Sequence, residues 1–300
     1  MIHGVLNIYK EQGFTSHDVV AKLRGILRQK KIGHTGTLDP AATGVLPVCL
    51  GKATKLCGML TDETKSYETV LLLGQTTDTQ DTTGTVLSSC PVQVTEEEVR
   101  EAVRSFTGEQ LQIPPMYSAL KVNGKKLYEL AREGKEIERK ARKVQFYRIE
   151  ILDLELPRVR MEVTCSKGTY IRTLCHDLGD KLGCGGCMER LERTRVGSFS
   201  REESITLSQV EALQKAGELK AKITPIPDLF AGFPAVRALP EEGPYLNNGN
   251  PIYRDRTEEP ELWEDGAQVR MYRSDGAFVG IFRCDEETEK YAPVKMFLQD

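Results

Sequence analysis

The spacing of hydrophobic and polar positions changes several times along the chain and predicts helices mixed with short strands. Apolar and polar residues alternate over 3–9 and 158–165, which is typical of strands with one buried face. Apolar stripes at helical spacing predict helices over 16–28 and 170–182. A Thr-Glu-Glu-Glu capping box predicts that another helix begins after Thr95. Because the elements do not alternate as strand, helix, strand, we expect an α+β fold on a mostly antiparallel sheet.

A segment rich in proline and phenylalanine, at 225–234, predicts a boundary between two domains. Beyond it, alternating segments at 268–272 and 277–282 flank a Ser-Asp-Gly turn, which predicts a β-hairpin. Further short strands and turns surround this hairpin and are typical of a small β-barrel. We therefore expect one large domain over 1–230 and a small β domain over 231–300.

The overall composition is that of a globular protein with a substantial core. Of the 300 residues, 39% are hydrophobic and 28% are charged. No apolar run approaches the ~20 residues of a membrane helix, and the first residues lack the pattern of a signal peptide. The eight cysteines are scattered, mostly in apolar surroundings. Reduced thiols of this kind predict a cytoplasmic protein.

The formal net charge of −3 hides an uneven distribution. Residues 1–230 carry 33 Lys and Arg against 30 Asp and Glu, whereas 231–300 carry 8 against 14. The segment 121–148 alone has ten basic and four acidic residues, and Arg193 and Arg195 are expected on the exposed face of a later strand. Such charges form either a solvated face or a surface that neutralises nucleic-acid phosphates. The charge pattern alone leaves both possibilities open.

The most specialised stretch is the glycine- and threonine-rich loop GHTGTLDPAATGVLPVCLG at 33–51, with Asp39 at its centre. An Asp-Pro pair is ordinarily only a turn. Arg172, expected at the start of a helix, is either a surface charge or the partner of a buried Asp whose pKa it would lower. Tyr67 is either a core aromatic or a ring that faces a nucleic-acid base. Composition and spacing do not choose between these alternatives.

The sequence gives no indication of a metal or a cofactor. Cys184 and Cys187 have the spacing of metal ligands, with His176 upstream, but no second ligand pair follows them. There is no phosphate-binding loop, dinucleotide fingerprint, HExxH motif or GxSxG motif. We therefore expect chemistry carried by a carboxylate, arginines and aromatic side chains, without a cofactor.

Several segments resemble, in the right order, motifs of the bacterial TruB-type tRNA pseudouridine synthases. Residues 33–46 closely resemble the catalytic-loop motif of that family, and 165–172 resemble its arginine motif. Residues 112–120 and 124–128 resemble parts of its RNA-gripping insertion, which we place at about 112–144. The tail is more loosely similar to a PUA-like C-terminal domain.

Two further segments resemble family motifs but depart from them by one residue each. Lys65-Ser66-Tyr67 is similar to a Lys-Arg-Tyr segment, with Ser66 in place of arginine. Leu191-Glu192-Arg193 occupies the place of a Leu-Arg-Arg motif, with Glu192 in place of arginine. Each departure removes a positive charge that the family motif would place there, so the motif's contribution to RNA affinity does not carry over to these two positions.

The resemblance implies an isomerase that converts uridine 55, in the T-loop of tRNA, to pseudouridine without a cofactor. The bond from ribose C1′ to N1 breaks, the uracil rotates, and C1′ bonds to C5. The resemblance further implies that Asp39 is the catalytic carboxylate, that Arg172 pairs with it, and that Tyr67 stacks on the uracil and relays the C5 proton. The resemblance leaves open whether Asp39 attacks C1′ or removes the 2′ proton. The substrate-binding residues carried over in the same way are His34, Lys55, Leu191, Lys125, Lys126, Tyr128 and Arg193.

The implied partner is the T-arm stem-loop of tRNA, bound by a monomer that contacts no membrane. Flipping a base out of a folded loop costs a few kcal/mol, of which stacking on Tyr67 would return ~1–3 kcal/mol. The alternative function is a non-catalytic tRNA-folding chaperone that uses the same groove. A glycosidase would need a second acid in a comparable motif, and the sequence shows none.

Overall fold

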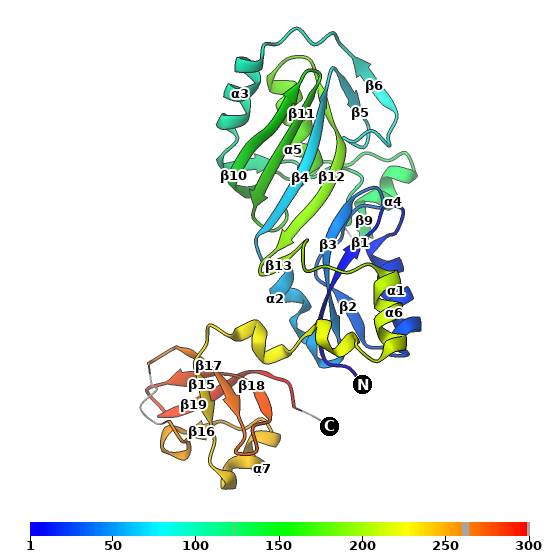
Figure 1. Cartoon of the computed structure of the whole chain (residues 1–300). Coiled ribbons are helices and arrows are strands. Elements are labelled where there is room, and N and C mark those ends of the chain that lie inside the picture. Colours follow the sequence, from blue (N-terminus) through cyan, green and yellow to red (C-terminus); the bar gives the residue numbers. More distant parts are fainter. Residues whose placement is uncertain (123, 260–263, 299–300) are drawn as a thin grey trace. The chain divides into compact units, whose positions relative to one another are not determined.

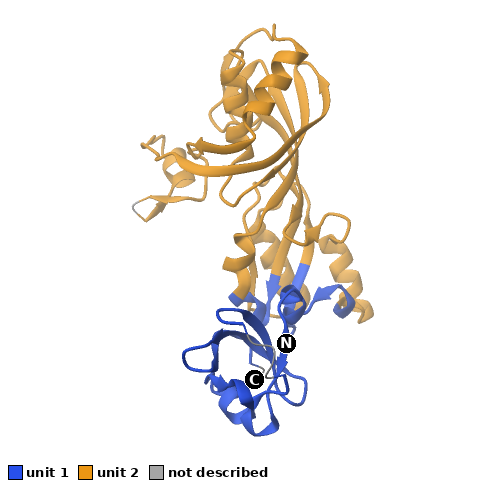
Figure 2. Ribbon diagram, turned by 90° about the vertical axis from the view of Figure 1, so that its left-hand side faces the viewer, with its two compact units in different colours: residues 1–6, 49–55, 220–300 blue, residues 7–48, 56–219 orange. Residues whose placement is uncertain are grey.

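The computed structural model describes residues 1–122, 124–259 and 264–298. The chain forms two compact units, and both are discontinuous in sequence (Figure 2). The larger unit comprises residues 7–48 and 56–219, and the smaller unit comprises residues 1–6, 49–55 and 220–300. No helix in the described part of the chain is long and apolar enough to span a membrane.

The larger unit is built on a mixed but mostly antiparallel sheet (Figure 1). Its strands follow the order β1 (Gly4–Lys10), β3 (Thr43–Leu50), β12 (Gly186–Val196), β4 (Lys65–Leu73), β11 (Arg158–Cys165), β10 (Arg142–Glu155) and β7 (Gly108–Gln112). β12 runs parallel to β3, and each pair from β12 to β7 is antiparallel. The short strands β2 (Ile32–His34) and β13 (Phe199–Ser200) pair with β3 and β12. This architecture confirms the predicted α+β class.

Helices α1, α3 and α6 begin at threonines that cap them. Thr15 caps α1 (Ser16–Leu27): its hydroxyl accepts from the Asp18 amide at 3.0 Å, and the Asp18 carboxylate accepts from the Thr15 amide at 2.8 Å. The same arrangement starts α3 (Glu96–Ser105) and α6 (Leu207–Ala216). α5 (Ile171–Lys181) packs its apolar face against the sheet. The remaining elements of this unit are α2 (Cys57–Thr61), β5 (Gln75–Thr77), β6 (Val86–Ser89), β8 (Lys121–Val122), β9 (Lys125–Lys126) and α4 (Leu127–Arg132). The 3-10 segment Leu219–Lys222 begins at the last residue of this unit, and its other residues belong to the smaller unit.

The alternation along β4 decides which side chains reach the core. Tyr67 and Leu71 are buried, whereas Ser66 and Glu68, on the opposite face of the strand, are partly exposed. Tyr67 belongs to one apolar cluster with Leu191 of β12 and with buried residues of α5. The strand pairing therefore puts Tyr67 and Leu191 on the same face of the sheet.

The smaller unit contains the β domain that the sequence predicts. Its five-stranded sheet has the order β15 (Ala235–Arg237), β17 (Gln268–Tyr272), β18 (Phe278–Asp285), β19 (Lys290–Met296) and β16 (Ile252–Tyr253). β17 and β18 form the expected antiparallel hairpin. Its other elements are β14 (Ile223–Thr224), α7 (Gly243–Asn247) and the 3-10 segments Gly51–Leu56, Ile226–Phe230, Pro240–Glu242 and Arg254–Arg256.

Candidate active site

A pocket of about 730 Å³ in the larger unit collects residues that lie far apart in the sequence. The loop before β3 contributes Asp39, the sheet contributes Tyr67 and Leu191, and the start of α5 contributes Arg172. The turn after β5 and the insertion before β10 complete the lining. A pocket of this size accommodates a nucleoside-sized ligand.

The loop that carries Asp39 is held to the rest of the unit by its backbone. The amide of Leu38 donates to Ser16 Oγ at 2.9 Å, and the amide of Gly13 donates to Pro40 O at 2.9 Å. At the end of the loop Gly44 has a φ of +106°, and a Cβ there would lie 2.2 Å from the carbonyl oxygen of Arg193. Only glycine fits that position, so the loop packs directly on β12.

Asp39 is paired with Arg172. Arg172 Nε lies 3.1 Å from Asp39 Oδ2, and Arg172 Nη2 donates to Asp39 Oδ1 at 3.4 Å. The arginine side chain is only 6% exposed, whereas the aspartate side chain is 38% exposed and faces the pocket. Two parallel contacts fix the orientation of the carboxylate as well as its position.

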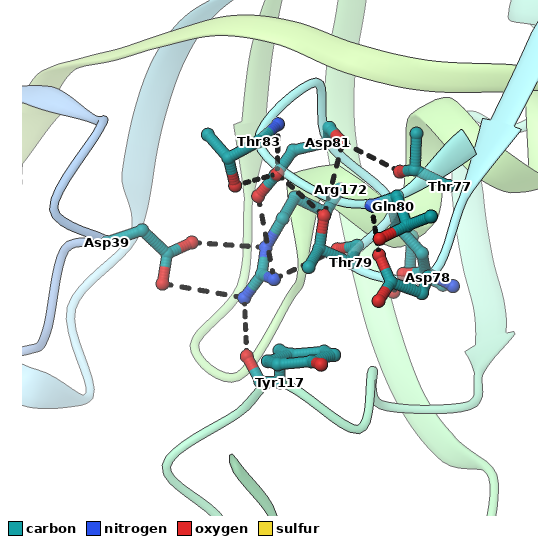
Figure 3. A network of polar contacts seen from close by, with 11 residues as sticks. Asp39, Thr77, Asp78, Thr79, Gln80, Asp81, Thr83, Tyr117 and Arg172 are labelled. Carbon is teal, nitrogen blue, oxygen red and sulfur yellow. Dashed lines mark hydrogen bonds and ion pairs between the residues drawn. The ribbon is translucent and has the colours of Figure 1, made fainter. Parts of the chain in front are cut away.

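The guanidinium of Arg172 uses its remaining donors on other protein groups (Figure 3). Nη2 also donates to Tyr117 O at 2.8 Å, and Nη1 donates to Thr79 O at 3.0 Å. Nη1 lies 3.7 Å from Asp81 Oδ2. Each of its three nitrogens therefore contacts a protein group. Arg172 is thus buried among protein groups and holds Asp39 in place.

Asp81 is the site residue that sequence reasoning missed. It lies in the polar turn after β5, is 8% exposed, and its Oδ1 accepts from Thr79 Oγ1, Thr83 N and Thr83 Oγ1 at 2.8, 2.9 and 2.5 Å. The turn is tied to β12 because the amide of Thr82 donates to Met188 O at 3.0 Å. The run of threonine and aspartate around Asp81 could have indicated an ordered turn, since such side chains form hydrogen bonds to the nearby backbone. A second acid thus exists, but its Oδ1 already accepts three hydrogen bonds and its Oδ2 faces the positive charge of Arg172.

Arg172 lowers the pKa of Asp39 as predicted, but the net shift of this pKa is upward. Burial raises the pKa of Asp39 above its usual range, and the positive charge of Arg172 opposes this rise without cancelling it. The negative charge of Asp81 adds to the rise, and Lys10 opposes it more weakly. Arg172 therefore serves mainly to orient Asp39.

Tyr67, Leu191 and Arg193 line the sheet side of the pocket. Tyr67 and Leu191 are each 8% exposed, and burial raises the pKa of Tyr67 to about 12. The prediction that Arg193 lies on an exposed strand face is wrong: this side chain is 1% exposed, whereas Arg195 is exposed as expected. A bulge between Arg193 and Arg195 changes the alternation of the strand at this point.

The insertion brings two of its three predicted RNA-binding residues to the pocket. Tyr128 lies under two cations, with Lys126 Nζ 5.3 Å and Arg132 Cζ 5.4 Å from its ring centroid. Lys126, Tyr128 and Arg132 all line the pocket, although Arg132 was not among the predicted residues. Lys125 is not part of the lining, and its Nζ lies 3.6 Å from Glu133 Oε1. The pocket therefore has one basic, aromatic edge.

The other predicted substrate contacts lie outside the pocket lining. The ring of His34 packs edge-on against His17 with centroids 5.3 Å apart, and it is His17 that lines the pocket. Burial lowers the pKa of His34. Lys55 belongs to the smaller unit, where its Nζ donates to Met296 O at 2.9 Å.

The two departures from the family motifs lie away from the pocket. Ser66 Oγ is 2.9 Å from Thr164 Oγ1 on the neighbouring strand. Glu192 accepts from the Tyr9 hydroxyl at 3.1 Å and lies 3.5 Å from Arg201. Neither side chain lines the pocket. The lost positive charges therefore change the polar contacts of the sheet rather than the pocket wall.

The paired cysteines are engaged in local contacts. Cys184 Sγ donates to Gly185 O at 3.6 Å, and Cys187 Sγ accepts from Gln75 Nε2 at 3.5 Å. Burial raises the pKa of both thiols. Among the residues that the structure describes, no three His, Cys, Asp or Glu side chains are grouped to hold a metal ion.

Two family descriptions match consecutive parts of the chain. Residues 24–171 match "TruB family pseudouridylate synthase (N terminal domain)", and residues 172–230 match "tRNA pseudouridylate synthase B C-terminal domain". The chain is 51% identical over 311 residues to a tRNA pseudouridine synthase B of Lachnoclostridium phytofermentans, covering 99% of this chain and 100% of that protein. A tRNA pseudouridine synthase B of Alkaliphilus oremlandii is 44% identical over 302 residues, covering 99% of both chains.

Two solved structures have a similar fold over almost the whole chain. One is an H/ACA RNP bound to a substrate RNA containing 2′-deoxyuridine, with a TM-score of 0.72 and 26% identity, covering 99% of this chain and 86% of that chain. The other is a Cbf5-Nop10-Gar1 complex, with a TM-score of 0.72 and 28% identity, covering 99% of this chain and 84% of that chain.

Proposed function

The chain belongs to the TruB family of pseudouridylate synthases, and from that premise we propose that it isomerises a uridine of tRNA to pseudouridine. The observation that carries the proposal is the pair of Asp39 and Arg172 at a nucleoside-sized pocket. The arginine fixes the carboxylate, and the half-exposed carboxylate faces the space that a ribose would fill.

We propose Asp39 as the catalytic carboxylate, acting on the ribose of a flipped-out uridine. Tyr67 supports this role because its ring forms part of the pocket wall and can stack on a base. Leu191, on the same face of the sheet, would pack against the rotating uracil. The reaction breaks the C1′–N1 bond and forms a C1′–C5 bond, so no atoms or electrons are gained or lost.

The basic edge of the pocket supports an RNA substrate. Lys126 and Arg132 hold two positive charges close to the ring of Tyr128, where the phosphates that flank a flipped nucleotide would pass. The family resemblance further suggests the T-loop, with uridine 55 as the target and the T-arm as the recognised element. In this proposal His34 supports the everted loop and Lys55 contacts RNA from the smaller unit.

The proposal also includes the organisation of the chain. Residues 1–230 act as the catalytic domain, with the insertion at about 112–144 gripping RNA, and 231–300 act as a PUA-like domain. The protein works as a monomer in the cytoplasm. A tRNA-folding chaperone would use the same pocket, but it would not need a carboxylate held by two contacts from a buried arginine.

The decisive experiment treats unmodified tRNA with the wild-type protein and with Asp39→Asn, and maps pseudouridine by carbodiimide labelling and reverse transcription. We expect one modified T-loop position with the wild type, none with Asp39→Asn, and tRNA binding by both. Asp180→Asn, an exposed carboxylate on α5, serves as the matched control. Retained activity in Asp39→Asn removes the catalytic role of this residue. Tight binding without turnover by the wild type favours the chaperone.

A further inference from the structure

Arg193 occupies an unusual position for an arginine. It is the largest of the fully buried side chains in the described part of the chain, with 1% exposure, although it lines the same pocket as Asp39. A side chain this deep lies below the surface that a phosphate backbone would follow. Its place therefore excludes the role of a surface RNA contact, and its positive charge needs another explanation.

The contacts of Arg193 leave its charge without a carboxylate partner. Nε donates to Val45 O at 2.7 Å, and Nη2 donates to Gly36 O at 3.4 Å. Within the described residues, no Asp or Glu oxygen lies within 4 Å of this guanidinium. Buried charges are normally paired, because an isolated one is costly. The two carbonyl contacts hold the group in place but do not neutralise it.

One neighbour of Arg193 that can develop a negative charge is the Tyr67 phenol. Arg193 and Tyr67 are directly opposite each other in the β12–β4 pair, and both are buried. Burial raises the pKa of Tyr67, and the positive charge and hydrogen bonding of Arg193 are the largest of the effects that oppose the rise. Arg172 is directed elsewhere, since it contacts Asp39, Asp81 and two carbonyl oxygens.

We propose that Arg193 is a positioning residue that stabilises negative charge on the Tyr67 oxygen during the final proton transfer; this rests on the proposed function. Once C1′ has bonded to C5, the ring has an N1=C6 double bond and a proton on C5. Tyr67 gives its phenolic proton to N1 and takes the C5 proton in return. The electron pair of the C5–H bond forms the C5=C6 double bond. Between the two transfers the phenol oxygen is an anion beside Arg193.

The test compares turnover of RNA containing uridine with that of RNA containing 5-deuterouridine. Arg193→Gln removes the charge, and Arg193→Lys keeps it; thermal melts and RNA binding verify that both variants fold and bind. We expect Arg193→Gln to be slower by about 10²-fold, with a primary isotope effect larger than that of the wild type. Arg193→Lys should restore part of the rate and bring the isotope effect part of the way back to that of the wild type. Arg195→Gln, the exposed arginine of the same strand, should match the wild type.

The outcomes separate this inference from the proposed function. If the wild type forms no pseudouridine, the proposed function fails first. If the wild type is active and folded Arg193→Gln is slow with an unchanged isotope effect, Arg193 acts only through packing and the inference is overturned. If Arg193→Gln does not fold, an isotope effect in Arg193→Lys equal to that of the wild type at a lower rate overturns it equally.

Discussion

Arg172 meets Asp39 through two contacts, with Nε 3.1 Å from Oδ2 and Nη2 donating to Oδ1 at 3.4 Å. The same guanidinium also contacts Asp81 on its other side. One buried cation thus joins two carboxylates, one half-exposed at the pocket and one buried in a turn. The arrangement requires a planar group with donors in several directions, which only arginine provides.

Arg172→Lys is expected to lower turnover by more than about 10²-fold, because an ammonium cannot orient both carboxylates. Affinity for tRNA should change little, since the Arg172 side chain is only 6% exposed and contacts protein groups. Single-turnover rates and equilibrium binding measure the two effects separately. Lys181→Arg, at a cation near the other end of the same helix, controls for general effects of exchanging lysine and arginine. Near-normal turnover in Arg172→Lys would show that orientation of Asp39 is not limiting.

Asp81→Asn tests whether the buried turn supports the catalytic pair. Asparagine can accept from the Thr79 and Thr83 donors through its oxygen, but its NH₂ then faces the Nη1 donor of Arg172. Two donors facing each other should displace the guanidinium and lower turnover by about 10-fold or more. Asp78→Asn, in the same turn but without a contact to Arg172, is the matched control. Equal rates for the two variants would contradict this account.

The pH dependence of turnover should report the raised pKa of Asp39. In the proposed reaction Asp39 acts as the ionised carboxylate, so the rate should rise with pH, with a midpoint above the ordinary value of 3.8. The charge of Asp81 is one cause of the raised pKa, so its removal in Asp81→Asn should move the midpoint to lower pH. Single-turnover rates across the acid range measure both midpoints. A midpoint that moves to higher pH in Asp81→Asn would reverse the assigned sign.

The sequence could predict those features that depend on local pattern. Alternation predicted β11, and the Asp-Gly turn predicted the β17–β18 hairpin. The Asp39 loop stood out because glycines and prolines are concentrated there. Its pairing with Arg172, which the resemblance implied, is present in the structure.

The remaining features depend on tertiary packing, which local pattern does not contain. Asp81 lies in a turn that reads as ordinary polar loop, and only its contact with Arg172 gives it significance. Arg193 was expected on the exposed face because the bulge beside it cannot be read from residue types. The net effect on the pKa of Asp39 is a balance of burial against Arg172, and burial is known only from the fold.

The insertion should contribute RNA affinity rather than chemistry. Lys126→Ala and Arg132→Ala each remove one cation from the basic edge of the pocket, so each should weaken tRNA binding and reduce the salt slope by about 1. At saturating tRNA, the rate should fall much less than the affinity. Lys215→Ala, an exposed lysine on α6, is the control. Unchanged affinity and salt slope in both variants would show that the basic edge is a solvated face.

Lys65 gives a prediction on stability with a definite sign. It is 6% exposed, its Nζ donates to Thr61 O at 2.7 Å and to Glu63 O at 2.5 Å, and burial, followed by the charge of Arg193, lowers its pKa to about 8. In the unfolded chain the pKa returns to 10.5. Between these two values the unfolded state holds the proton that the folded state has lost, so stability rises with pH.

Lys65→Met removes this linkage. The unfolding free energy of the wild type, measured relative to Lys65→Met, should therefore rise by up to about 3 kcal/mol between pH 8 and 10.5. Below pH 8 the difference should be constant, because Lys65 is then protonated in both states. Urea unfolding of both proteins across this range measures the difference, with Lys215→Met as the control for loss of an exposed lysine. A difference that stays constant up to pH 10.5 would mean that the two backbone carbonyls stabilise the ammonium as well as water does.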